Sequence, residues 1–267
     1  MKKKSLVLSA LLAIFAFASP ALAHFQMVYT PESALEKGGD LPLKMVFTHP
    51  FEAGHTMDME QPLKFEVLHK GETKDLTSTL KPITWKSLTN EGKAFETSYA
   101  LRGMGDWVFA LTPAPYFEAN EDAYIQQFTK VVVNAAGAPT DWDAELGLPA
   151  EIVPLDKPYG LWAGNVFRGI VKGGGEPVPF AEIEVEFLNH EPDMKANKFG
   201  EKAAIEAPHD SLAVQTIKAD ANGVFVYALP KAGWWGFAAL GAGPVDKYKD
   251  KELSQDAVIW VQAKPMP

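Results

Sequence analysis

The chain has 267 residues, with 25 Lys and Arg against 34 Asp and Glu, which gives a formal net charge of −9 at pH 7. This acidic balance argues against nucleic acid and anionic lipid surfaces as partners, and it mildly favours the attraction of cations. The chain has no cysteine, so disulfides, thiol chemistry and cysteine-ligated zinc or iron–sulfur sites are excluded.

The first 23 residues have the order of a secretory signal peptide. Three lysines at 2–4 precede an apolar run at 6–18, and Ala-Leu-Ala follows at 21–23. The apolar run is shorter than the roughly 20 residues that a membrane-spanning helix needs. We therefore expect cleavage after Ala23, a periplasmic location, and a mature chain without a transmembrane segment.

Cleavage after Ala23 would make His24 the first residue of the mature chain. The free α-amine and the imidazole of one residue can close a chelate ring on a metal ion. An α-amine with a pKa near its ordinary value of about 7.7–8.0 gives up its proton to a metal at little cost at neutral pH. The alternative is that cleavage leaves a histidine there by chance.

Short apolar segments that alternate with polar residues follow from residue 25 onward, separated by Gly, Pro and Asn. Period-two patterning of this kind predicts an all-β fold built from antiparallel sandwiches, Ig-like or transthyretin-like. A connector rich in Pro and Gly at 135–160 divides the chain into an N-terminal sandwich, 24–157, and a C-terminal sandwich, 158–267. We allow the apolar stretch at 152–155 to pair with the first sheet. The expected strands are 25–29, 41–47, 63–68, 95–99, 106–111, 128–134, 165–171, 183–187, 214–218, 224–229, 234–239 and 258–261.

The stretch at 48–59, Thr-His-Pro-Phe-Glu-Ala-Gly-His-Thr-Met-Asp-Met, carries two histidines and two methionines at the end of an expected strand. Imidazole suits late first-row metals, and thioether sulfur favours softer ions such as Cu(I). An ordinary polar loop between two strands explains this stretch equally well, but the histidine at position 24 favours a metal site. The predicted ligands are His24, His49 and His55, with Glu52, Met57 and Met59 as further ligands or as hydrogen-bond partners of the ligands.

Several longer motifs carry a resemblance to one family. They are His-Phe-Gln at 24–26, Phe-Thr-His-Pro-Phe-Glu at 47–52, Met-Asp-Met at 57–59, Thr-Lys-Val-Val-Val-Asn at 129–134, Pro-Tyr-Gly-Leu-Trp-Ala-Gly-Asn at 158–165 and Ala-Gly-Trp-Trp-Gly-Phe at 232–237. The chain resembles the periplasmic component of ABC-type cobalt/nickel uptake systems, a NikM-like family that also carries a domain-of-unknown-function label. The resemblance implies two β-rich domains that capture or deliver Co²⁺ or Ni²⁺ for an energy-coupling-factor importer, whose membrane permease and ATPase would be the partners.

The family's histidines fall by position on His24 and His49, and its Met-x-Met falls on Met57 and Met59. His55 has no counterpart in this pattern. Close relatives are expected to carry a histidine just before Thr129, where this chain has Gln-Gln-Phe at 126–128. If that histidine contributes to metal binding, its absence lowers the affinity or changes the ion in this chain. The metal that the resemblance implies is Ni²⁺ or Co²⁺, with Cu²⁺ left open because divalent copper binds most tightly at almost any such site.

Two other classes of function stay open. An N-terminal histidine with a second histidine on a β-sandwich is also the arrangement of histidine-brace copper mono-oxygenases. Neither the substrate surface nor the axial tyrosine of those enzymes can be identified here, and we expect no enzyme activity. The third class is an exported interaction or carbohydrate-binding module without metal. On a strand, Trp234 and Trp235 would point to opposite faces, so we expect one in the core and the other over the domain interface, with a sugar-binding platform as the alternative.

The remaining histidines and tryptophans are assigned structural roles. We expect the histidines at 69, 190 and 209 to be solvated turn or loop residues, the last two within a polar insertion at about 189–211. The expected core or interface aromatic residues are Trp85, Trp107, Trp162 and Trp260.

Overall fold

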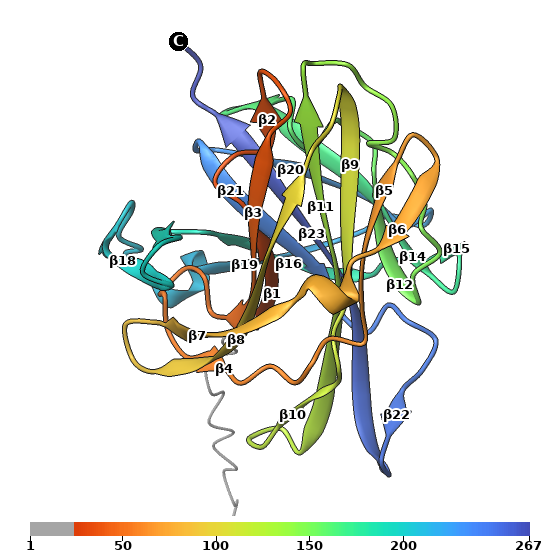
Figure 1. The fold of residues 1–267 in the computed structure, drawn as a ribbon. Coiled ribbons are helices and arrows are strands. Elements are labelled where there is room, and N and C mark those ends of the chain that lie inside the picture. The colour runs from red at the N-terminus through yellow and green to blue at the C-terminus, as the bar shows by residue number, and fades with distance from the viewer. Residues whose placement is uncertain (1–23) are drawn as a thin grey trace, which may run out of the picture.

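The computed structural model describes residues 24–267, and the predicted signal peptide at 1–23 lies outside them. The regular structure consists of strands and two short 3₁₀ turns, η1 (Thr77–Thr79) and η2 (Asp210–Leu212), and most strands pair antiparallel (Figure 1). The all-β fold expected from the alternating segments is confirmed. Within residues 24–267, no helix is long and apolar enough to cross a membrane.

The strands form three sheets. The first sheet contains β1 (Phe25–Tyr29), β3 (Asp40–Thr48), β4 (Thr56–Met57), β7 (Lys81–Lys86), β8 (Glu91–Ala100), β17 (His190–Asp193) and β18 (Lys198–Ala203). The middle sheet has the order β19 (Val214–Lys218), β16 (Glu182–Phe187), β21 (Gly233–Ala239), β23 (Lys251–Lys264), β11 (Ala123–Ala135), β9 (Gly105–Thr112), β5 (Lys64–His69) and β6 (Glu72–Asp75), with β2 (Ala34–Leu35), β10 (Tyr116–Glu118), β13 (Leu161–Trp162) and β22 (Lys247–Tyr248) at its margins. The small sheet contains β12 (Ala150–Pro154), β14 (Val166–Gly173), β15 (Glu176–Pro177) and β20 (Val224–Ala228).

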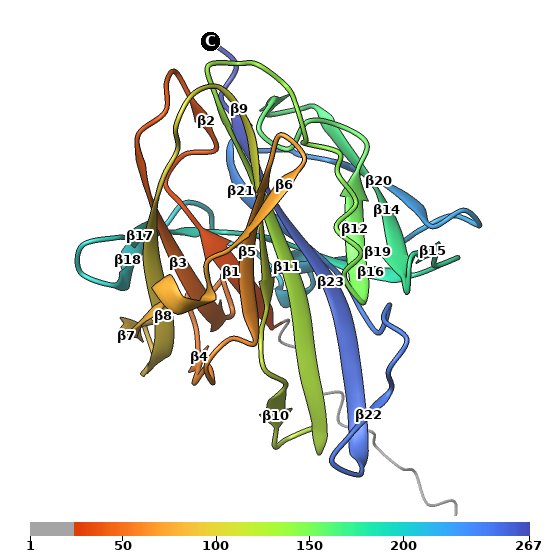
Figure 2. The ribbon, with the colours of Figure 1, turned by 45° about the vertical axis from the view of Figure 1, so that its right-hand side comes forward.

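The middle sheet is the common wall of two hydrophobic cores. Trp234 and Trp260 belong to the core shared with the first sheet, whereas Trp235 and Ile259 belong to the core shared with the small sheet. Successive side chains on a strand point to opposite faces, so a strand buried on both faces needs apolar residues at every position. Figure 2 shows the middle sheet between the other two.

The two halves of the sequence meet where β11 and β23 pair in parallel, with Gln127 opposite Asp256 and Val131 opposite Trp260. The interpretation of 152–155 as a strand of the first sheet is wrong. Residues 150–154 form β12 and pair with β14, with Ile152 opposite Val171 in the small sheet. Ile152 is buried in the core of that sheet, which explains the pairing.

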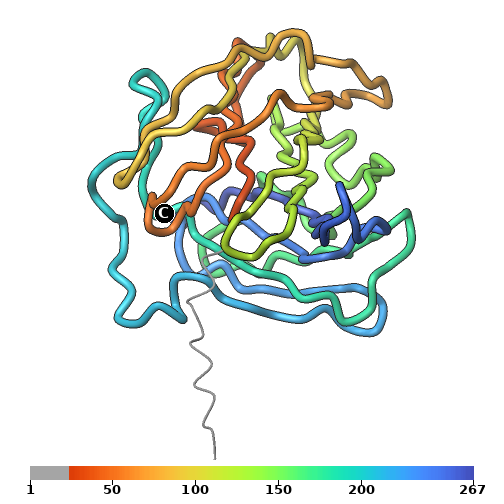
Figure 3. The backbone as a smooth tube through the Cα atoms, turned by 90° about the horizontal axis from the view of Figure 1, so that it is seen from below, coloured from red at the N-terminus to blue at the C-terminus, as the bar shows by residue number. Residues whose placement is uncertain are grey.

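The N-terminal strand β1 lies on the middle sheet while it pairs with β3 (Figure 3). Its close approach depends on Gly236 of β21, because a Cβ at that position would lie 2.9 Å from the ring of Phe25. The indole Nε1 of Trp260 donates a hydrogen bond to the carbonyl oxygen of Gln26 at 3.0 Å. These contacts fix the start of β1, and hence the backbone of His24.

The polar insertion is not a solvated loop throughout. Its first part forms the hairpin β17–β18, and Lys198 of β18 pairs with Lys86 of β7 at the edge of the first sheet. The ammonium group of Lys44 also donates to the side-chain oxygen of Asn197 at 2.6 Å. A hairpin can extend an existing sheet edge even when its sequence is polar, because the ladder bonds come from the backbone.

Candidate metal centre

The register of β1 and β3 brings two distant histidines together. Phe25 pairs with Thr48 in an antiparallel ladder, so the next residues outward, His24 and His49, are cross-strand neighbours. Their ring centroids lie 4.7 Å apart with an angle of 53° between the ring planes. His49 is buried, with 5% of its surface exposed, and His24 is partly buried.

Two residues outside the predicted site contact His24, and a third supports one of them. Its imidazole Nε2 lies 3.1 Å from a carboxylate oxygen of Glu118, at the end of β10. Its carbonyl oxygen accepts a hydrogen bond from the side-chain amide of Gln127 at 2.7 Å, and the same amide donates to Asp256 at 3.2 Å. Gln127 stands in the segment where we expected a histidine in close relatives, and it fixes the backbone of His24.

Burial lowers the pKa of His24 below its ordinary value of 6.5, although the negative charges of Glu118, Glu121 and Asp256 oppose this effect. A neutral imidazole is the form that binds metal ions, so no proton has to be displaced from this ring at neutral pH. Asp256 is itself buried, and its pKa is raised mainly by desolvation.

The loop after His49 is anchored on β16. Glu186 is buried and accepts a hydrogen bond from the backbone N–H of Phe51 at 2.6 Å. The carbonyl oxygen of His49 accepts a bond from the N–H of Gly54 at 3.2 Å, which closes the turn. Burial raises the pKa of Glu186 well above its ordinary value, despite the hydrogen bond from Phe51.

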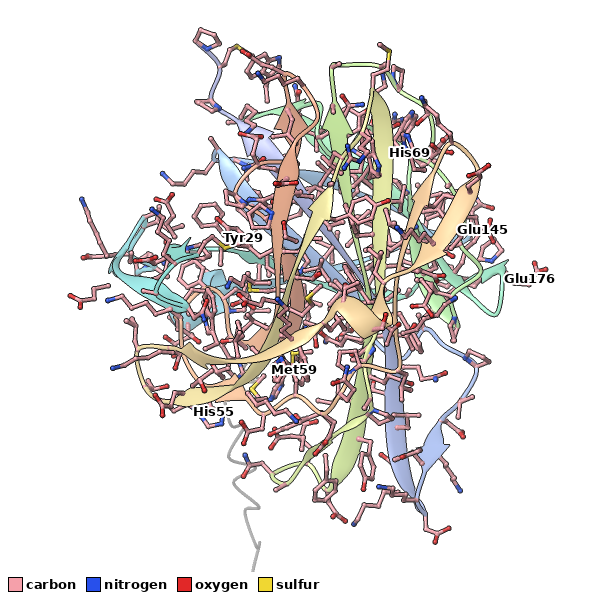
Figure 4. The ribbon with its side chains drawn as sticks, viewed as in Figure 1. Tyr29, His55, Met59, His69, Glu145 and Glu176 are labelled. Atoms are coloured by element: carbon pink, nitrogen blue, oxygen red, sulfur yellow. The ribbon has the colours of Figure 1, made fainter. Side chains whose placement is uncertain are left out.

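The other four predicted residues are two exposed and two buried side chains. His55 and Glu52 are exposed, and Figure 4 shows His55 at the outer edge of the first sheet. Met57 is a buried core residue, and the sulfur of Met59 accepts a hydrogen bond from the side-chain amide of Gln26 at 3.6 Å. Within residues 24–267, no group of three or more His, Asp or Glu side chains has an arrangement that could hold a metal ion.

Sequence reasoning missed Glu118, Gln127 and Asp256 because they lie about a hundred residues or more from His24 and carry no local motif. Long-range strand pairing alone places them beside the histidine pair: β10 pairs with β11, and β11 pairs in parallel with β23. The expected histidine before Thr129 was the only sequence signal that pointed to this part of β11.

Three of the structural assignments need correction. His69 is not a solvated turn residue: its ring stacks on Trp107 at 4.1 Å, and its Nδ1 lies 2.7 Å from the carbonyl oxygen of Asp106. His190 is buried in β17, with its Nδ1 2.8 Å from the carbonyl oxygen of Gly200. Trp162 is 43% exposed, because it lies in a two-residue strand at the end of β23.

The other assignments hold. His209 is exposed and accepts a hydrogen bond from the backbone N–H of Ser211, which is a loop role. The three remaining tryptophans, Trp85, Trp107 and Trp260, are buried as expected. Trp234 and Trp235 are both buried and point into different cores, so they do not form an exposed sugar-binding platform.

Comparisons with solved structures give only distant likenesses. The D0-D1 domain of intimin is 9% identical, with 90% of this chain and 100% of that chain covered and a TM-score of 0.21. Trypsin-activated alpha-2-macroglobulin from Escherichia coli is 9% identical, with 92% of this chain and 16% of that chain covered and a TM-score of 0.25. A putative carbohydrate binding protein from Bacteroides uniformis ATCC 8492 is 14% identical, with 77% and 90% covered and a TM-score of 0.23.

No curated protein matches the chain. One family does: its description is "Domain of unknown function (DUF4198)", and the match runs over residues 21–243. This match spans most of the sequence and includes both histidines of the ring pair as well as strands of all three sheets. The chain therefore belongs to the DUF4198 family.

Proposed function

We propose that this protein is an exported, periplasmic metal-binding accessory protein that captures or delivers Ni²⁺ or Co²⁺ for an ABC or energy-coupling-factor importer. The observation that carries the proposal is the contact between the rings of His24 and His49, 4.7 Å apart. Two imidazoles, one just before β1 and one just after β3, meet at the residue that cleavage after Ala23 would make the mature N-terminus.

The hydrogen bond to Glu118 supports one way for His24 to bind a metal. Because Nε2 faces the carboxylate, Nδ1 is the ring nitrogen left for an ion. Nδ1 and the α-amine of the same residue close a six-membered chelate ring on that ion. Metal-bound histidines usually donate their other N–H to an oxygen acceptor, which fixes the ring and strengthens the ligand.

The distance between the rings suits a shared ion. With a metal–nitrogen bond of about 2.1 Å, each ring centroid would lie a little over 3 Å from the ion. Two centroids 4.7 Å apart then correspond to a nitrogen–metal–nitrogen angle of roughly 90°. His24 and His49 would thus supply three nitrogen donors, and water would complete the coordination of an ion that must later be released.

A copper protein of the histidine-brace type is the second candidate. The same three nitrogens, two of them from an N-terminal histidine, form that ligand set, and divalent copper binds nitrogen ligands more tightly than nickel or cobalt. The two candidates differ in redox chemistry. Consumption of oxygen by the copper-loaded protein in the presence of ascorbate would favour the copper enzyme over the transport role.

The test is calorimetric titration of the mature protein, cleaved after Ala23, with Ni²⁺, Co²⁺ and Cu²⁺. A second protein carries one extra residue before His24, and two variants carry His49→Ala and His55→Ala. We expect one-to-one binding that the extension and His49→Ala each weaken about tenfold or more, since each removes at least one donor.

His55→Ala is the matched control, because His55 is exposed on the same loop. It should bind like the unaltered protein. Binding that persists in both the extended protein and His49→Ala would place the metal elsewhere in the chain. If none of the proteins binds any of the three ions, the metal hypothesis is refuted, and an interaction module without metal becomes the better explanation.

A further inference from the structure

A cavity of about 310 Å³ opens beside the histidine pair, between the loop after β4 and the strands β10 and β11. Phe47 forms part of its wall, and the ring of Phe47 lies 5.7 Å from that of His24. Ligand pockets in proteins typically measure about 300–1,000 Å³, so this cavity has the size for a small metabolite rather than an oligosaccharide or a peptide.

Four aromatic side chains form one part of the cavity wall, which we call the aromatic wall. Phe47 and Tyr116 meet edge to face at 5.3 Å, and Phe117 and Tyr124 meet at 5.1 Å. Further apolar surface comes from Met59, Ile125 and residues 113–115, and the polar residues Gln26 and Gln127 also line the cavity. Aromatic rings at a concave surface offer large contact areas to an apolar body of similar size.

Charged groups of opposite sign line the cavity beside different aromatic rings. Asp58 lines the cavity near Tyr116. The pKa of Tyr116 is raised mainly by burial, and the nearby negative charges of Glu118 and Asp58 raise it further. The ammonium group of Lys249 lines the cavity near Tyr124, 5.9 Å from the centre of that ring.

We propose that this cavity binds a small zwitterion of amino-acid size. Its ammonium group would face the carboxylates of Asp58 and Glu60, its carboxylate would face Lys249, and its apolar body would lie against the aromatic wall. A simple amine would leave Lys249 without a partner in the ligand, and a simple carboxylate would lie against two like charges. A molecule with both groups matches both kinds of charge.

The proposal does not rest on metal binding, so it is tested on the mature protein without added metal. Isothermal titration uses L-phenylalanine and L-leucine as zwitterions, phenethylamine as the ammonium-only analogue, hydrocinnamate as the carboxylate-only analogue, and glucose as a neutral ligand. We expect a zwitterion to bind about tenfold tighter than either single-charge analogue, because each loses one ion contact with the protein.

Two variants test which charged residues of the cavity contact the carboxylate and the ammonium group of the ligand. Lys249→Gln should weaken the binding of the amino acids and hydrocinnamate by about tenfold and leave phenethylamine unchanged. The double variant Asp58→Asn with Glu60→Gln should weaken the amino acids and phenethylamine and spare hydrocinnamate. Lys247→Gln, a change on the neighbouring strand β22 outside the cavity lining, is the matched control and should bind like the unaltered protein.

Three results would overturn the proposal. The first is that neither amino acid binds. The second is that glucose or a single-charge analogue binds as tightly as the better amino acid. The third is that the Lys249 variant and the Asp58/Glu60 double variant affect phenethylamine and hydrocinnamate alike. Because no metal is present, each of these results leaves the test of the histidine pair unaffected.

Discussion

The buried ion pair between Lys130 and Glu151 gives the sharpest stability prediction. Lys130 lies in the middle of β11, and its ammonium nitrogen is 2.6 Å from a carboxylate oxygen of Glu151 in β12. The two side chains are only 1% and 2% exposed. This pair joins the middle sheet to the small sheet across the connector between the two halves of the chain.

Replacement of Lys130 by Met removes the ammonium group and leaves a buried carboxylate. Glu151 still accepts hydrogen bonds from the backbone N–H groups of Leu146, Gly147 and Leu148, at 2.8, 2.9 and 3.3 Å. Breaking a buried ion pair on one side typically costs about 3–5 kcal/mol. Because three amides still face the carboxylate, we expect the Lys130→Met variant to lose about 3 kcal/mol, the lower end of that range.

The companion variant Glu151→Gln keeps an acceptor for the amides but removes the charge. The two changes share one contact, so their effects should not add. The double variant should lose about 1–3 kcal/mol less than the sum of the single losses, as for other directly contacting residues. That coupling separates the ion pair from the general cost of altering two buried positions.

The assay is equilibrium unfolding of the mature protein in urea at pH 7. Lys218→Met is the matched control, because Lys218 pairs with Glu182 at 3.6 Å on the surface, where the two side chains are 67% and 49% exposed. An exposed pair contributes only about 0–1 kcal/mol. If Lys130→Met destabilises the protein no more than Lys218→Met does, the reasoning about the buried pair is refuted.

Three further changes test other contacts and charges in the fold. Gly236→Ala should cost about 1–3 kcal/mol in urea unfolding, since the new Cβ lies 2.9 Å from the ring of Phe25; an unchanged midpoint would mean that β1 is not held by this contact. Burial raises the pKa of Glu184 from 4.5 to about 7, so the stability it contributes is full below pH 4.5 and is lost as the pH rises through 7. The stability of the unaltered protein should therefore fall between pH 4.5 and 8 by up to about 3 kcal/mol more than that of the Glu184→Gln variant, and by less where solvent screens the charge. An identical dependence of stability on pH in the two proteins would contradict this. Glu118→Gln should weaken metal binding about 10–100-fold in calorimetry, because its carboxylate accepts the N–H of His24; an unchanged affinity would show that this contact does not support the ligand.

The sequence by itself determined the fold class. Alternation such as Ile-Glu-Val-Glu-Phe at 183–187 places apolar side chains on one face of a strand, and the structure has β16 there. The adjacent tryptophans at 234 and 235 were also expected on opposite faces, because neighbouring side chains on a strand diverge. Both inferences need only local periodicity, which each segment carries in full.

The sequence predicts candidate ligands for the site but not which of them lie together. The residue types in the loop after β3 and the histidine at position 24 pointed to metal ligands without any knowledge of pairing. Which of them meet depended on register: the β1–β3 ladder brings His24 to His49, whereas His55 is exposed. A shift of one residue in that ladder would turn the two rings to opposite faces.

Tertiary structure alone supplied the remainder. Glu118 and Gln127 reach His24, and Asp256 reaches Gln127, because β10, β11 and β23 are neighbours in one sheet, an arrangement that no segment encodes locally. The same long-range packing stacks His69 on a tryptophan and gives two cores a single shared wall. Sequence periodicity determines which face of a strand is apolar. Which other strand or sheet packs against that face depends on how the whole chain buries its apolar surface, so it cannot be read from one segment.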